Sequence, residues 1–82
     1  MKGEIVERVV TYVAKAIAEE PEAVRVEMID EGPDRILAEV RTAKRDMGRV
    51  IGRRGRVANA FRTLAQAAGE EEGIQANVEF VD

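Results

Sequence analysis

The residues best suited to chemistry lie in one short basic turn, Gly52-Arg53-Arg54-Gly55. Glycine lacks a Cβ, so it adopts positive φ angles and lets another backbone approach closely. If a helix begins near Gly55, its unpaired N–H groups and the positive end of its dipole point at the turn. Arg53 and Arg54 add two permanent cations, each with several hydrogen-bond donors. This combination predicts a cradle for phosphate groups.

Charge is distributed unevenly along the chain. The net charge of the 82 residues is −3, yet residues 41–62 hold eight cations and a single anion, Asp46. The remaining residues hold five cations and fifteen anions. A basic segment on an acidic body is typical of an electrostatic footprint for nucleic acid, whereas scattered charge would indicate only a solvated surface. The footprint is centred on the glycine turn.

The composition narrows the remaining chemistry. The chain has no cysteine and no histidine, which excludes disulfides, thiolate nucleophiles, thiolate zinc sites and imidazole acid–base catalysis. No pair of carboxylates stands out, so an enzyme is the least favoured class, and no catalytic residue, metal site or cofactor is predicted. The chain begins unlike a signal peptide and has no stretch of membrane-spanning length, so we expect a cytoplasmic protein without a membrane partner.

The first half of the chain predicts a helix followed by a hairpin. Apolar residues recur at three- and four-residue spacings over residues 3–19, and Pro21 ends this helix. Tyr12 is expected to be its partly buried anchor. Residues 24–29 and 35–42 alternate between apolar and polar around a Gly-Pro turn, so they predict an antiparallel hairpin.

The second half predicts two helices around the turn and a final strand. A short helix over residues 47–51 takes Asp46 as its N-cap. A longer one begins at about Arg56 and is ended after Ala68 by Gly69. An acidic loop, Glu70-Glu71-Glu72, and Gly73 then lead to a strand over residues 76–80. A crossover through both helices would place the last two strands parallel and adjacent.

The predicted class is therefore α+β, with the order α-β-β-α-α-β and a three-stranded mixed sheet that carries three helices on one face. This order and the stretch Val50–Gly55 resemble the type II KH fold. The match continues through Asp46–Gly52, Gly55–Ala58, Phe61–Thr63 and Ala67–Ala68, and Ile5–Val6, Pro21–Val24 and Val78–Phe80 also fit. Over nearly its whole length, residues 1–82, the chain is similar to the KhpA family of single-KH-domain bacterial RNA-binding proteins, with the GxxG turn at 52–55.

The resemblance implies a partner and a set of binding residues. The implied partner is single-stranded RNA, bound in a groove between the two helices and the last strand, by an RNA chaperone or post-transcriptional regulator. By the family pattern, the turn would hold the sugar–phosphate backbone. The predicted RNA-binding residues are Gly52, Arg53, Arg54, Gly55, Arg49, Val50, Ile51, Arg56 and Val57. Val50, Ile51 and Val57 suit either the apolar floor of the groove or the core.

Two features bear on the strength and selectivity of RNA binding. No aromatic platform is evident, so modest sequence selectivity is expected. The acidic residues Glu70–Glu72 precede the last strand, beside the expected groove, where they would repel phosphate. Either this segment points away from the groove, or RNA binding is weaker or shorter than the basic turn suggests.

Two alternatives remain open. KhpA proteins form homodimers or heterodimers with a Jag-type (KhpB) partner, and the alanines Ala58, Ala60 and Ala67 favour an assembly module that acts mainly through a protein partner. A helix-turn-helix DNA reader also contains a short helix, a turn and a longer helix. The flanking hairpin, the terminal strand and two arginines inside the turn favour the KH interpretation.

Overall fold

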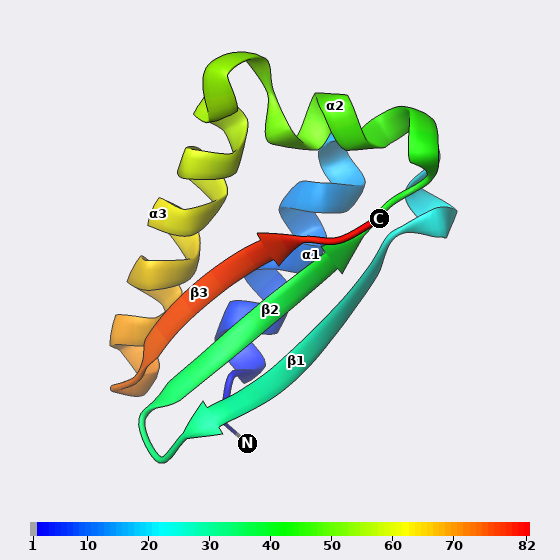
Figure 1. The fold of residues 1–82 in the computed structure, drawn as a ribbon. Coiled ribbons are helices and arrows are strands. Elements are labelled where there is room, and N and C mark those ends of the chain that lie inside the picture. The colour runs from blue at the N-terminus through cyan, green and yellow to red at the C-terminus, as the bar shows by residue number, and fades with distance from the viewer. Residues whose placement is uncertain (1) are drawn as a thin grey trace.

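The computed structural model describes residues 2–82. Their order confirms the α+β class and the predicted succession of elements (Figure 1). The helices and strands are α1 (Glu4–Ile17), β1 (Arg25–Gly32), β2 (Arg35–Arg41), α2 (Met47–Ile51), α3 (Arg56–Glu72) and β3 (Gln75–Phe80). Short 3₁₀ turns at Pro21–Ala23, Lys44–Asp46 and Arg53–Gly55 connect them. Within residues 2–82, no helix combines the length and the apolar character needed to cross a membrane.

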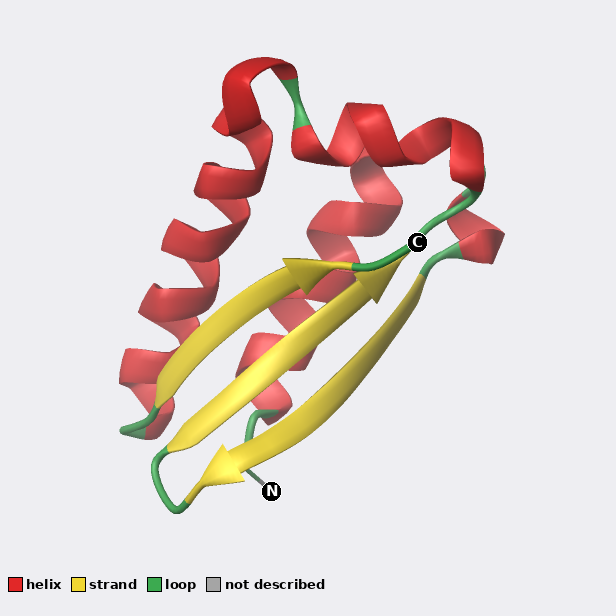
Figure 2. Ribbon diagram, viewed as in Figure 1, coloured by secondary structure: helices red, strands yellow, loops and turns green. Residues whose placement is uncertain are grey.

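The three strands form one mixed sheet in the order β1-β2-β3. β1 pairs antiparallel with β2, and β2 pairs parallel with β3, as the crossover through α2 and α3 requires. The helices cover one face of this sheet, while the other face is open (Figure 2). The register places Ile29, Leu37 and Asn77 side by side across the three strands.

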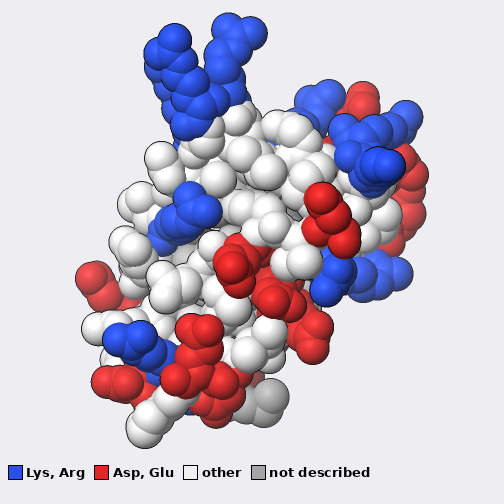
Figure 3. All heavy atoms as spheres, viewed as in Figure 1, with Lys and Arg blue, Asp and Glu red and all other residues white. Residues whose placement is uncertain are grey.

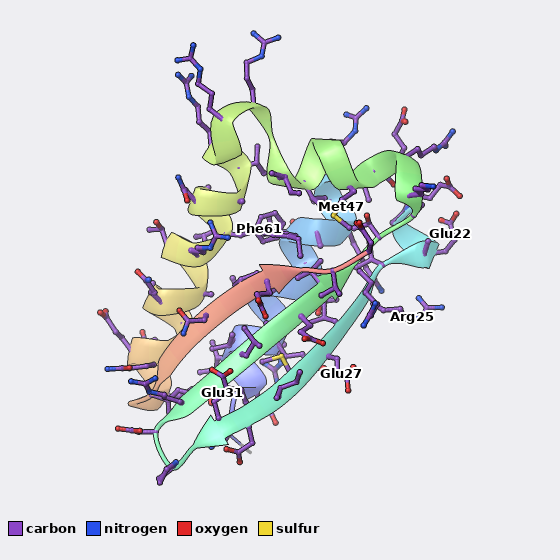
Figure 4. All side chains as sticks on the ribbon, viewed as in Figure 1. Glu22, Arg25, Glu27, Glu31, Met47 and Phe61 are labelled. Atoms are coloured by element: carbon purple, nitrogen blue, oxygen red, sulfur yellow. The ribbon has the colours of Figure 1, made fainter. Side chains whose placement is uncertain are left out.

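The core lies between the sheet and the helices. Every second residue of β2 and β3 points into it, which explains their alternating sequences. Phe61 of α3 points behind β3 (Figure 4), and its ring meets that of Phe80 edge to face at 5.2 Å. The buried apolar residues are Val6, Val10, Ala14, Val24, Ile36, Ala38, Val40, Val50, Phe61, Ala65, Ala68, Ala76 and Val78.

The end of α3 differs from the prediction, because the helix continues through Gly69 to Glu72. Gly69 is a packing position rather than a helix end: a Cβ there would lie 2.8 Å from the carbonyl oxygen of Ile74. The helix stops at Gly73, whose φ of 71° provides the left-handed cap. The predicted acidic loop is therefore the last turn of α3.

Glu72 joins this last turn to the start of α1. Its carboxylate accepts hydrogen bonds from the backbone N–H groups of Gly3 at 2.7 Å, Ile5 at 2.8 Å and Val6 at 3.2 Å. These are N–H groups at the start of a helix, which have no partner within the helix itself. Burial raises the pKa of Glu72, but these hydrogen bonds outweigh it and leave the pKa below its ordinary value.

Asp46 occupies the N-cap position of α2, as predicted, but its side chain makes no capping bond there. It is fully buried and accepts hydrogen bonds from the backbone N–H groups of Glu20 at 3.0 Å and Glu19 at 3.1 Å. The bond from Glu20 is the main cause of the lowered pKa of Asp46. Asp46 therefore fixes the start of α2 against the segment that follows α1.

Two details of α1 also differ from the prediction. The helix ends at Ile17, because Ala18 is already extended, so Pro21 begins a 3₁₀ turn rather than ending the helix. Tyr12 is 75% exposed and does not act as a buried anchor. The buried residues of α1 lie on the opposite stripe and are Val6, Val10 and Ala14.

Candidate nucleic-acid interface

The Gly52–Gly55 turn links α2 to α3 through a backbone that L-residues rarely adopt. φ is 78° at Gly52, 59° at Arg54 and 71° at Gly55. A Cβ at Gly52 would lie 2.5 Å from Cγ2 of Val57 and 2.9 Å from its backbone nitrogen, so only glycine fits there. A Cβ at Gly55 would meet no atom within 4 Å, so glycine is favoured at that position by φ alone.

The turn is closed and leads directly into a long helix. The N–H of Gly55 donates to the carbonyl oxygen of Gly52 at 3.1 Å. α3 then runs for 17 residues from Arg56, and no side chain caps its start. The positive end of this helix dipole therefore faces the turn, which favours an anion there.

The cations nearest the turn have no acidic partner. Arg53, Arg54 and Arg56 are exposed, and none of them forms an ion pair with another residue in the 2–82 range. Figure 3 shows basic side chains projecting from the end of the molecule where α2 meets α3. We call Arg53, Arg54 and Arg56 the free arginines.

Two basic residues close to the turn, Arg45 and Arg49, are held by carboxylates instead. Arg45 pairs with Glu20 at 2.7 Å, and Arg49 lies 3.7 Å from Glu19. Asp46 lies 3.9 Å from Arg49 as well. Arg49, which the sequence grouped with the turn, therefore belongs to a mixed-charge surface beside it. Its partner Glu19 precedes it by 30 residues in sequence, so spacing along the chain does not reveal this pair.

The three apolar residues predicted near the turn lie in different environments. Val50 is fully buried and belongs to the core, so it supports the turn from below rather than lining a surface. Ile51 is 37% exposed. Val57 is half-buried, packs against the core and covers Gly52. Ile51 and Val57 are therefore the apolar residues available at the surface.

Below the turn, α3 packs beside β3, and a hollow lies between them at the end of α3. We call the strip between these two elements the groove. The side of α3 toward β3 carries exposed polar residues at three- and four-residue spacings, namely Asn59, Arg62, Gln66 and Glu70. β3 is an edge strand. Gln75 donates its N–H to the carbonyl oxygen of Asp34, just before β2, at 2.7 Å, and Val81 donates to that of Val40 in β2 at 2.9 Å. Backbone groups alternate in direction along a strand, so those of Ala76, Val78 and Phe80 point away from β2. This row of backbone donors and acceptors has no signature in the residue types, although the parallel crossover implies it.

Acidic residues lie on the open face of the sheet. Glu27, Glu39 and Glu79 are neighbours in register across the three strands. Acidic side chains gather over the sheet in Figure 3, away from the projecting basic ones. Arg25, Arg35 and Arg41 lie on the same face toward the ends of the strands, so the charge of the open face is mixed. The free arginines, in contrast, are cations that pair with no carboxylate in the 2–82 range, which favours phosphate there.

Comparisons with known proteins agree with this architecture. The family model described as KhpA/KhpB, KH domain matches residues 7–80. A protein from Caldanaerobacter subterraneus subsp. tengcongensis named RNA-binding protein KhpA is 43% identical over 72 residues, which cover 88% of this chain and 95% of the relative. Proteins of the same name from Leifsonia xyli subsp. xyli and Clostridium perfringens are 42% identical over 68 residues and 38% identical over 72 residues. These matches cover 83% and 88% of this chain, and 88% and 95% of the two relatives.

The family model spans α3, β3 and the glycine turn. The observed element order, the parallel pairing of β2 with β3 and the positive-φ turn between α2 and α3 are features that the sequence predicted. The chain belongs to the KhpA/KhpB family of KH domains.

Proposed function

We propose that this chain binds single-stranded RNA, as an RNA chaperone or post-transcriptional regulator, with the Gly52–Gly55 turn on the sugar–phosphate backbone. The relatives are named RNA-binding proteins. The observation that carries the proposal is the set of free arginines beside the uncapped start of α3. Cations already paired with carboxylates would have to give up those pairs to bind phosphate, whereas these three do not.

The groove between α3 and β3 would receive the bases. Its α3 side offers side-chain amides, and its β3 side offers backbone N–H and C=O groups. Ile51 and Val57 supply a small apolar surface near the turn. Hydrogen bonds to base edges, rather than stacking on aromatic rings, would then distinguish one base from another.

An amide NMR titration with a pool of short single-stranded RNAs tests where RNA binds. We expect shifts at residues 49–57, along the Asn59–Glu70 side of α3 and in β3, and these shifts should weaken as salt is raised. The open-face residues Glu27 and Glu39 are the internal control and should not shift. Shifts confined to the open face, or none in a folded sample, would contradict the proposal.

A second function, assembly through a protein partner, is favoured by a different side of α3. Leu64 is 43% exposed, and Ala60 and Ala67 are exposed beside it at four- and three-residue spacings. Ala58, which the sequence grouped with them, is buried. We propose this stripe as the contact for a second copy or a KhpB-type partner. In the same NMR experiment, its amides should shift with protein concentration and not with RNA.

A further inference from the structure

A small pocket lies at the end of the groove farthest from the turn. Its volume is about 240 Å³. Pockets for drug-sized ligands occupy roughly 300–1,000 Å³, so this one suits a single planar group. Its lining residues are Gln66, Glu70, Ile74, Gln75, Ala76 and Asn77.

The lining presents hydrogen-bonding groups from two elements. Gln66 and Glu70 are four residues apart on α3, so their side chains lie next to each other. Ala76 contributes its outward backbone N–H and C=O from the free edge of β3. The amides can donate and accept, but the carboxylate of Glu70 can only accept. A ligand in this pocket must therefore present donors to Glu70.

The fold gains little from Glu70. Within residues 2–82 its side chain has no hydrogen bond and no ion pair, and it is exposed. A negative charge in the last turn of a helix opposes the helix dipole. The charge of Glu72, two residues later, opposes the dipole too, but the hydrogen bonds that Glu72 accepts at the start of α1 offset this cost. Glu70 has no such role.

The distance from the turn to the pocket matches the length of RNA that one KH domain binds. Arg56 and Glu70 are 14 residues apart on α3, which at the helical rise per residue is about 20 Å. The GxxG loop of a KH domain clamps about four nucleotides, so a pocket at this distance meets the last base of that stretch. A phosphate there would face the charge of Glu70, so the base rather than the backbone would enter.

We propose that this pocket selects guanine through Glu70. The inference rests on the proposed RNA binding and adds base selectivity to it. Guanine presents two adjacent donors, N1–H and the N2 amino group, to the two carboxylate oxygens of Glu70. Cytosine and adenine offer one amino group each. Uracil presents carbonyl oxygens on either side of its single N–H, and these oxygens repel a carboxylate.

The experiment measures the affinity of the full chain for fluorescein-labelled hexamers in which one guanosine is moved through each position of a uridine strand. A matched set carries inosine, which lacks only the N2 amino group. In the best register, we expect guanosine to bind more tightly than inosine by on the order of tenfold, the value of a hydrogen bond to a charged group. Glu70→Gln should remove most of this difference.

The control is Glu71→Gln, which removes the same charge from the exposed neighbouring residue outside the pocket. It should leave the guanosine-to-inosine ratio unchanged. Equal affinities for guanosine and inosine in every register, or equal effects of the two substitutions, would overturn the selectivity while leaving RNA binding intact. Absence of binding to all of these RNAs would instead overturn the proposed function.

Discussion

The two glycines of the turn are required for different reasons, although their φ angles are nearly equal at 78° and 71°. Gly52 lies against Val57, and Gly55 faces open space. The sequence predicted a turn with positive φ at this place, because few other residue types adopt it. It could not predict which glycine is also limited by contact, since that depends on where Val57 packs after α3 has formed.

Alanine substitutions separate the two requirements. Gly55→Ala should cost about 1 kcal/mol, because only the left-handed backbone opposes it. Gly52→Ala should cost on the order of 3 kcal/mol, because a Cβ 2.5 Å from Val57 adds overlap with a core-packed side chain and its backbone. Urea unfolding of both variants measures the difference. Equal losses of stability would contradict the assigned role of Gly52.

Individual charges near the turn were the least predictable part of the site. The sequence identified the basic segment and placed its centre at Arg53 and Arg54. It could not separate Arg45 and Arg49 from the free arginines, because their partners Glu20 and Glu19 come from the segment that follows α1. Such pairs arise only when Asp46 fixes the start of α2 against that segment.

At the scale of elements, the ends of helices depended on tertiary contacts. Gly69 has the sequence pattern of a helix end, yet it lies inside α3. The residue is glycine because Ile74 and Ala76 lie too close to leave room for a side chain. The acidic residues after it then continue the helix and bring Glu72 to the start of α1. A contact between residues so far apart in sequence has no local signal.

The Glu72 contact predicts a pH dependence of stability. The pKa of Glu72 is lower in the folded chain than its ordinary value of 4.5, so the unfolded chain binds a proton first as the pH falls. The contribution of Glu72 is therefore complete above about pH 4.5 and is lost as the pH falls through the lowered value. Asp46, whose pKa is also lowered, acts in the same direction.

Glu72→Gln should destabilise the chain at neutral pH by about 1 kcal/mol, the typical value of a helix cap, and should make stability less dependent on pH in the acid range. Urea unfolding at a series of pH values measures both effects. Glu71→Gln is the matched control, because Glu71 is exposed and no hydrogen bond of its side chain is found in the 2–82 range. A variant as stable as the parent at every pH would contradict the role of Glu72.

At the scale of the molecule, the sheet order and the single helical layer were predictable. Alternating strands, a tight hairpin turn and a two-helix crossover leave few arrangements for a short chain. The groove was predicted only in outline, because its β3 side consists of backbone groups, which carry no residue signature. The basic end was predicted from the uneven charge along the chain, whereas the row of Glu27, Glu39 and Glu79 arises only when the three strands pair.

The central claim is that the free arginines bind the RNA backbone, and the salt dependence of RNA affinity tests it most directly. Three arginine–phosphate contacts predict a slope of about −2 for the logarithm of the binding constant against the logarithm of salt concentration. Arg53→Asp with Arg54→Asp should abolish measurable binding while the fold is retained. Arg8→Asp with Lys15→Asp changes the net charge equally on exposed positions of α1 and should reduce affinity only modestly. Retained affinity and an unchanged slope in the folded Arg53→Asp, Arg54→Asp variant would contradict the account.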